Sequence, residues 1–196
     1  MMAGCSSADD EGDVESTGAV PQVSTTEDVI VTPDPAPKEV RTVATSQVGE
    51  AVQPDGVPLV RARITSADDE VCEVCVWLAD DSAERSQGLK GVTDLGEAVG
   101  MVFSWDEPVA NRFVMIETPT PLSIAWFDDT GAYVSEVDME PCLEVDAVNC
   151  ARYSAAAPYV LAIEMFQGEL DAIGIGPGSR LELLTGTEAP TCDASG

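Results

Sequence analysis

Residues 111–134 constrain the fold of this chain more than any other stretch. Residues 112–118 alternate with apolar side chains on both faces, which predicts an interior strand covered on both sides. Two prolines then interrupt the strand, because proline has no N–H to donate. A second strand is predicted at residues 122–127, and a turn ending in Gly131 leads into a third. Three consecutive strands with tight connections predict a meander, the usual seed of an antiparallel sheet.

The segment before this stretch predicts a hairpin followed by a short helix. Apolar and polar residues alternate over residues 60–65 and again over residues 72–78, with a turn between them. Residues 81–84 read Asp-Ser-Ala-Glu, a pattern in which the first and last side chains bond backbone N–H groups at a helix start. A helix is therefore predicted over residues 82–89, where glycine stops it.

The remaining apolar segments also favour strands. They are short, they lie between tight turns, and no strand–helix–strand spacing is visible among them; they occupy residues 100–103, 159–165 and 180–184. In contrast, residues 105–111, which begin with Trp105, are predicted to be a loop. The fold class predicted is mainly β, an antiparallel sandwich or partly closed barrel of about eight strands with one or two short helices.

Charge and composition exclude several classes of function. The chain has 196 residues, with 36 acidic and 9 basic side chains and a net charge of −27. Nucleic acids and anionic membrane surfaces would repel such a chain, so neither is expected as a partner. The chain has no histidine, which removes Ser-His and Cys-His catalysis and histidine zinc sites. No run of about 18 apolar residues occurs, so no membrane-spanning segment is predicted.

Composition also divides the chain. Residues 6–57 contain no aromatic residue and are rich in proline, serine and acidic residues. Such a segment buries too little apolar area to offset an ordering cost of roughly 1–2 kcal/mol per residue. The predicted organisation is an N-terminus and disordered tether over residues 1–57, a β-rich domain over 58–186, and a polar tail over 187–196.

The first seven residues resemble the end of a bacterial lipoprotein signal, with Cys5 as the lipid-bearing residue. The positively charged and apolar regions of such a signal do not precede it, so either they lie outside this sequence or the match is accidental. An acidic, serine-rich segment directly after Cys5 favours the first reading. We therefore predict an extracytoplasmic cell-envelope lipoprotein that contacts the membrane only through a lipid at Cys5.

The other cysteines predict structural disulfide chemistry. Cys142 and Cys150 flank a short irregular segment, and a disulfide between them would stabilise the fold by about 2–3 kcal/mol. Cys72 and Cys75 have redox-motif spacing, but they lie in a strand and face opposite sides, so they are not expected to bond each other. Cys72 is predicted to be buried, and Cys75 is predicted not to pair with Cys192. No metal site and no cofactor are predicted.

Several short segments together resemble one protein family, the domain of unknown function 192 family. Besides residues 111–134, the matching segments follow in the same order at residues 78–80, 84–89, 100–103, 121–124, 140–142, 159–161 and 174–178. The resemblance implies a compact β-rich domain over roughly residues 60–184, often extracytoplasmic, whose activity is not established.

The chain departs from the pattern of that family at several positions. The family usually reads Phe-Trp-Met-Lys-Asn-Thr where residues 113–118 are Phe-Val-Met-Ile-Glu-Thr. It usually has aspartate where this chain has Ser123, and methionine where this chain has Lys90. If the family's polar site uses that lysine, asparagine and aspartate, this member has altered it.

Five residues are the predicted ligand-binding candidates. Arg85 belongs to the matched Glu-Arg-x-x-Gly-Leu motif and is expected to hold an anion or a structural salt bridge. Trp105, in a predicted polar loop, is the best aromatic surface for a sugar. Arg112, Thr118 and Tyr153 complete the set, and the most informative observation is whether Arg85, Thr118 and Tyr153 converge on one cleft.

Carboxylates provide the alternative chemistry. Some of the acids could form a glycosidase-like pair or a calcium cluster; those considered are Glu117, Asp128, Glu136, Asp138 and Glu140. The leading hypothesis is a non-enzymatic, lipid-tethered β-domain that binds a small molecule, glycan or envelope partner. One alternative is a carboxylate-dependent enzyme acting on carbohydrate or envelope substrates, and another is a purely structural envelope protein. Two carboxylates about 5–10 Å apart in one pocket would favour the enzyme, whereas an aromatic pocket without them favours binding.

Overall fold

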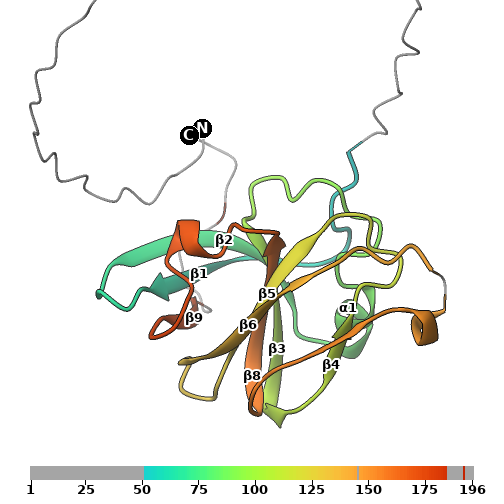
Figure 1. Cartoon of the computed structure of the whole chain (residues 1–196). Helices are drawn as coiled ribbons and strands as arrows, with labels where there is room; N and C mark the ends of the chain where they lie inside the picture. Colours follow the sequence, from blue (N-terminus) through green and yellow to red (C-terminus); the bar gives the residue numbers. More distant parts are fainter. Residues whose placement is uncertain (1–50, 145, 185–191, 193–196) are drawn as a thin grey trace, which may run out of the picture. The chain divides into compact units, whose positions relative to one another are not determined.

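The computed structural model describes residues 51–144, 146–184 and 192. This part of the chain forms nine strands, one α-helix and two short 3-10 turns (Figure 1). The strands are β1 (Leu59–Thr65), β2 (Val71–Ala79), β3 (Gly100–Val109), β4 (Arg112–Val114), β5 (Leu122–Phe127), β6 (Tyr133–Met139), β7 (Arg152–Ser154), β8 (Tyr159–Phe166) and β9 (Arg180–Leu184). The helix is α1 (Ser82–Gln87), and the turns are η1 (Ala147–Asn149) and η2 (Asp171–Ile173).

Seven strands form one sheet in the order β6-β5-β8-β3-β2-β1-β9, and β4 and β7 form a separate two-stranded sheet. The prediction of a mainly β fold is therefore confirmed, and no closed barrel forms in the described part of the chain. The large sheet is mixed rather than antiparallel, because β2 and β3 pair in parallel. The connection through α1 and residues 88–99 is long enough to return the chain to the same end of the sheet, which a hairpin turn cannot do.

The hairpin of β1 and β2 is confirmed. The two strands pair antiparallel, with Ala62 opposite Val74. Ala62, Ile64 and Val76 are fully buried, as their alternation with polar residues predicts.

The predicted meander over residues 111–134 is wrong in its first strand. β5 and β6 do form a hairpin, but β4 covers only three residues and pairs with β7 instead of β5. The place beside β5 is taken by β8, which pairs with it over its whole length. All six residues of β5 are buried, so this strand needs a hydrogen-bonding neighbour on each edge and cover on each face. β8, which is distant in sequence, supplies the neighbour on one edge.

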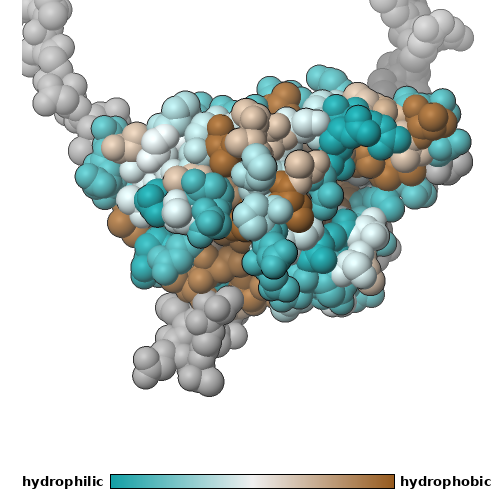
Figure 2. All heavy atoms as spheres, turned by 90° about the horizontal axis from the view of Figure 1, so that it is seen from below, coloured by the Kyte–Doolittle hydropathy of each residue, from teal (hydrophilic) through white to brown (hydrophobic). Residues whose placement is uncertain are grey.

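Two hydrophobic clusters cover the two faces of the large sheet. Leu122, Ile124 and Trp126 of β5 point into one cluster, whereas Ala125 and Phe127 point into the other. Figure 2 shows one face of the molecule on which hydrophilic side chains predominate and hydrophobic ones gather in smaller areas. The first cluster, on the side of α1 and β4, borders the site described below.

The predicted helix start is confirmed in detail. The Asp81 side chain accepts hydrogen bonds from the backbone N–H groups of Ala83 and Glu84, at 2.7 and 2.8 Å. Glu84 returns one by accepting from the N–H of Asp81 at 3.2 Å, which completes the capping box. The helix ends at Gln87, two residues earlier than predicted, because Gly88 takes a positive φ of 50°.

Two disulfides are described. The predicted bridge between Cys142 and Cys150 is present, with the two Cα atoms 5.9 Å apart. The prediction that Cys75 and Cys192 are not bonded to each other is wrong, since they form a disulfide across 117 residues of sequence. Cys72 is partly rather than fully buried, although it packs against the predicted face of its strand.

The register of the sheet explains the Cys75–Cys192 disulfide. Arg61 of β1 lies opposite Cys75 on one side and opposite Leu184 on the other. Leu184, the last residue of β9, therefore lies two strand spacings, or about 10 Å, from Cys75. The eight residues from Leu184 to Cys192 easily span that distance.

The disulfides indicate an oxidising, extracytoplasmic environment, as the localisation prediction requires. Within the described residues, no helix has the length and apolar character needed to cross a bilayer. The predicted lipid-bearing Cys5, the predicted tether up to residue 50, and most of the predicted C-terminal tail lie outside the described residues.

Candidate functional site

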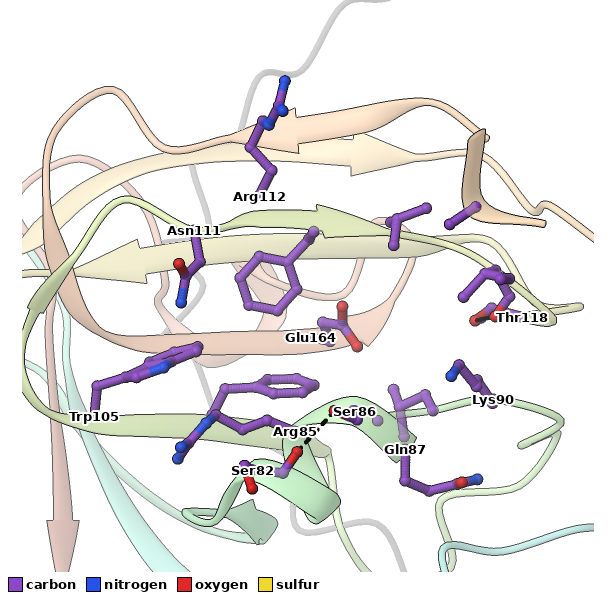
Figure 3. A pocket seen from close by; sticks show the side chains of 17 residues that line it. Ser82, Arg85, Ser86, Gln87, Lys90, Trp105, Asn111, Arg112, Thr118 and Glu164 are labelled. Carbon is purple, nitrogen blue, oxygen red and sulfur yellow. Dashed lines mark hydrogen bonds between the residues drawn. The ribbon is translucent and has the colours of Figure 1, made fainter. Parts of the chain in front are cut away.

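A cavity of about 700 Å³ lies between α1, the middle of β3 and the segment around β4 (Figure 3). This volume falls within the range of roughly 300–1,000 Å³ that is usual for small-molecule sites. Its walls come from three parts of the chain that are distant in sequence, and Glu164 of β8 lies at its floor. The Cys142–Cys150 loop contributes Ala147 at the rim.

Glu164 is the most unusual residue of the cavity. It lies on the central strand β8, opposite Met101 of β3 and Ile124 of β5, in the middle of an otherwise apolar face. It is 6% exposed, and no hydrogen bond to its carboxyl group comes from the described residues. Burial raises the pKa of this carboxyl group from 4.5 to about 8, because the charged form loses its hydration. At neutral pH the Glu164 carboxyl group is therefore protonated in most molecules.

Aromatic side chains form one wall of the cavity. The rings of Phe103 and Phe113 meet edge to face, with their centroids 5.1 Å apart. Trp105 contacts Phe113 at 6.3 Å and Tyr159 at 5.3 Å, again edge to face. The Tyr159 hydroxyl donates to the carbonyl of Asn111 at 3.1 Å, which fixes the turn between β3 and β4. Trp105 thus belongs to β3 and is partly buried, so the prediction that it lies in a polar loop is wrong.

Arg85 is anchored to the scaffold rather than to a carboxylate. Its Nη1 donates to the carbonyl of Ser104 at 2.7 Å and to that of Asp80, and its guanidinium lies 5.2 Å from the ring centroid of Trp105. It forms no ion pair within the described residues, although a salt bridge was one of its two predicted roles. Its positive charge therefore stays at the cavity wall, held rigidly by two carbonyls and an aromatic face.

Two further basic residues line the cavity. Figure 3 shows Lys90 across the cavity, with its amine on the side of Glu164, and Arg112 on β4 with its guanidinium directed away. Lys90 occupies the position where the related family usually has methionine, so its charge is a property of this chain. Neither residue pairs with a carboxylate of the described part.

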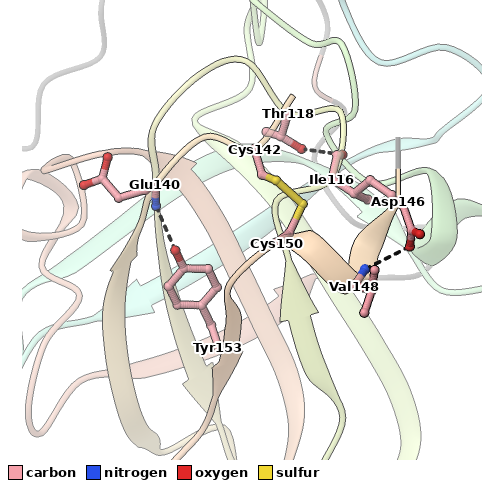
Figure 4. Close-up of a disulfide and its surroundings, with 8 residues drawn as sticks. All are labelled: Ile116, Thr118, Glu140, Cys142, Asp146, Val148, Cys150 and Tyr153. Carbon is pink, nitrogen blue, oxygen red and sulfur yellow. Dashed lines mark hydrogen bonds between the residues drawn. A yellow bond between two sulfur atoms is a disulfide. The ribbon is translucent and has the colours of Figure 1, made fainter. Parts of the chain in front are cut away.

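Thr118 reaches the cavity through the disulfide-bonded loop (Figure 4). Cys142 forms isolated β-bridges with both Ile116 and Thr118, and its bond to Cys150 ties this loop down. The Thr118 hydroxyl donates to the carbonyl of Ile116 at 3.2 Å. The disulfide thus supports the segment that forms one end of the cavity.

Four of the five predicted ligand-binding candidates line this one cavity, namely Arg85, Trp105, Arg112 and Thr118. Tyr153 does not line it, because its hydroxyl accepts a hydrogen bond from the N–H of Glu140 at 3.0 Å and its ring packs against the core (Figure 4). That these residues bind a ligand remains a prediction.

Sequence reasoning missed Glu164 as a site residue, although a signal was present. Residues 159–166 read Tyr-Val-Leu-Ala-Ile-Glu-Met-Phe, and Glu164 is the one charged residue in a segment that is otherwise apolar on both faces. A lone acid inside such a strand must either find a buried partner or face a cavity.

Among the described residues, Glu164 is the only acid that lines this cavity, so they form no carboxylate pair there. Glu136 and Asp138 instead line a second cavity of about 340 Å³ together with Asp171, and both lie exposed on edge strand β6. The Ser123 hydroxyl donates to Asp138 at 2.5 Å. In the described part of the chain, no group of three or more histidine, cysteine or acidic side chains is arranged to hold a metal ion.

Asp128 has a turn-forming role. It accepts hydrogen bonds from the hydroxyl and N–H of Thr130 and from the N–H of Ala132, at 2.7–2.9 Å. The bond from the Thr130 hydroxyl is the main cause that lowers the pKa of this carboxyl group. Asp128 therefore stabilises the turn between β5 and β6.

Comparison with solved structures supports the fold. A candidate transcription regulator from Sinorhizobium meliloti 1021 is 25% identical with a TM-score of 0.57, and the match covers 65% of this chain and 95% of that one. A protein of unknown function from Novosphingobium aromaticivorans DSM 12444 is 26% identical with a TM-score of 0.56, and the match covers 65% and 87% of the two chains. No curated protein matches the chain.

The family comparison covers the same part of the chain as the β-rich fold. The model of the domain of unknown function 192 family, described as an uncharacterised ancient conserved region, matches residues 63–183. These residues include the strands of the large sheet from within β1 to within β9, and the elements that build the cavity. The chain therefore belongs to the domain of unknown function 192 family.

Proposed function

We propose that this domain binds a small organic molecule in the cavity between α1, β3 and β4, outside the cytoplasm. The observation that carries the proposal is Glu164, a nearly buried carboxyl group with no hydrogen-bond partner among the described residues. Burying such a group without a partner costs about 1–3 kcal/mol even when it is neutral. A ligand that bonds to Glu164 would offset this cost, and functional sites are where such groups concentrate.

The surroundings of Glu164 favour binding over catalysis by a carboxylate pair. The cavity offers an aromatic wall, a floor with one polar group and a rigidly held arginine, which is the usual composition of a ligand site. Its raised pKa would also suit a general acid. Hydrolysis by two carboxylates, however, needs a second acid at the same cavity, and none of the lining residues supplies it.

Filling the cavity is expected to abolish binding. Ser86 and Ala83 are both exposed on α1, but only Ser86 lines the cavity. We therefore expect compounds that bind the wild-type protein to lose at least about tenfold in affinity for Ser86→Trp and to bind Ala83→Trp normally. The compounds would be selected by thermal shift from a panel of small carboxylates, phosphates, sugars and amines, and their Kd measured by calorimetry. If no compound binds, or if both variants bind equally well, the cavity is not a ligand site.

We also propose that the domain is held at the membrane by a lipid on Cys5. The resemblance of the first residues to a lipoprotein signal and the disulfides of the domain support this proposal. With an upstream signal supplied, the protein should sediment with membranes, and Cys5→Ser should release it. Equal solubility of the two forms, or a disulfide at Cys5 in non-reducing peptide maps, would contradict the anchor, because a thioether-linked sulfur cannot form a disulfide.

A further inference from the structure

We infer that the ligand of the cavity is a small organic anion, a carboxylate or phosphate on an apolar ring-sized body, whose charged group is received at Glu164 and Lys90. This inference rests on the proposed function and specifies its ligand class. It follows from three independent features: the distribution of charge over the chain, the state of the cavity floor, and the aromatic wall.

The cavity is basic in a strongly acidic protein. Among the described residues, three cations line it, namely Arg85, Lys90 and Arg112, whereas Glu164 is the only acid that does. Acids are four times as common as bases in this chain. Within the described residues, the ion pairs are instead those that Arg63 makes with Glu73 and Glu182. The charges of Arg85 and Lys90 thus remain available to an anion in the cavity, whereas the Arg112 guanidinium is directed away from it.

The floor of the cavity complements an anion as well. When protonated, the Glu164 carboxyl group donates one hydrogen bond, and an anionic oxygen is the strongest acceptor for that bond. A cationic ligand would instead meet the like charges of Arg85 and Lys90 and could gain an ion pair only after Glu164 had lost its proton. The wall suits an apolar body of the ligand, because the Phe103 and Phe113 rings line the cavity beside Glu164.

The groups around Glu164 determine how binding depends on pH. The region of α1 brings Arg85 and Lys90, β4 brings Arg112, and the neighbouring strands β3 and β5 bring the apolar Met101 and Ile124 opposite Glu164. Between pH 6.5 and 9 Glu164, whose pKa is about 8, loses its proton. Anion binding should weaken over this interval, because the ionised carboxylate repels the ligand and no longer donates.

The test uses four probes of one size and different charge: benzoate, phenyl phosphate, benzamide and benzylamine. Their Kd values for the wild-type protein would be measured by NMR titration at pH 6.5 and 9, and binding in the cavity identified by its loss in Ser86→Trp. We expect benzoate or phenyl phosphate to bind at least about tenfold more tightly than benzamide and benzylamine at pH 6.5. The two anions distinguish a carboxylate ligand from a phosphate ligand.

Three variants identify the residues that receive the anion. Lys90→Met, which restores the residue usual in the family, should weaken anion binding about tenfold or more. Arg152→Met should have little effect, since Arg152 is an exposed cation on β7 that does not line the cavity. Glu164→Gln, which keeps a donor but cannot ionise, should bind the anion with nearly the same Kd at pH 6.5 and 9.

The outcomes separate this inference from the proposed function. Tighter binding of benzylamine or benzamide than of either anion, with loss in Ser86→Trp, would overturn the anion assignment and leave the cavity as a ligand site. An equal effect of Lys90→Met and Arg152→Met, or an unchanged pH dependence in Glu164→Gln, would overturn the assignment of the receiving groups. If none of the four probes binds in a way that Ser86→Trp abolishes, both the inference and the proposed function lose their support.

Discussion

Removing the Cys75–Cys192 disulfide is expected to lower the free energy of unfolding by about 5 kcal/mol, twice the effect expected for the Cys142–Cys150 disulfide. A disulfide stabilises a fold mainly by restricting the unfolded chain, and the effect grows with the length of the loop that it closes. The two bridges close loops of 117 and 8 residues. The same relation predicts about 5 kcal/mol for the first and about 2.5 kcal/mol for the second.

Matched pairs of variants allow this comparison. The double variants Cys75→Ala/Cys192→Ala and Cys142→Ala/Cys150→Ala each remove one bridge without leaving a free thiol from it. Urea unfolding of both, next to the wild-type protein at one pH, gives the two differences in free energy. A larger loss from the Cys142–Cys150 pair would show that contacts of its loop, such as the bridges from Cys142 to Ile116 and Thr118, outweigh the chain entropy.

The stability of the Glu164→Gln variant relative to the wild-type protein is expected to rise by about 4 kcal/mol between pH 4.5 and pH 8. The pKa of Glu164 is about 8 in the folded protein and 4.5 in a solvated chain. Below pH 4.5 the carboxyl group is protonated in both states, so it favours neither. Between the two values the unfolded state releases its proton while the folded state keeps it, and wild-type stability falls by up to about 1.4 kcal/mol per pH unit. Above pH 8 both states are ionised and the difference stays constant.

Urea unfolding at pH 4.5, 6, 8 and 9 measures this difference. The other carboxylates titrate in both proteins, so subtraction of the two curves isolates Glu164. Glu169→Gln is the matched control, because Glu169 is exposed in the turn after β8, and its difference from the wild-type protein should not change with pH. A flat difference for Glu164→Gln would mean that Arg85 and Lys90 stabilise the ionised carboxylate in the folded protein.

Local signals in the sequence determined the elements whose partners lie nearby in the chain. The β1–β2 hairpin follows from alternation on either side of one turn, and the start of α1 follows from Asp81 and Glu84 three residues apart. The Cys142–Cys150 disulfide follows from a spacing that a short loop can close. In each case the interacting groups are close in sequence, so few other arrangements compete. The family resemblance added that Arg85, Arg112 and Thr118 belong to one domain, without stating which of them meet.

The tertiary structure alone decided the pairings between distant segments. β5 is apolar on both faces whether its neighbour is β4 or β8, so its sequence cannot identify the strand that pairs with it. The same holds for Cys75. The alternation of side chains along β2 shows which face of the strand Cys75 occupies, but it does not show that β9 ends two strands away, close enough for Cys192 to reach it. Glu164 shows the consequence for function. Its position in the sequence marks it as an acid within an apolar strand, but only the packing of α1 and β4 over β8 makes its surroundings a cavity rather than a core.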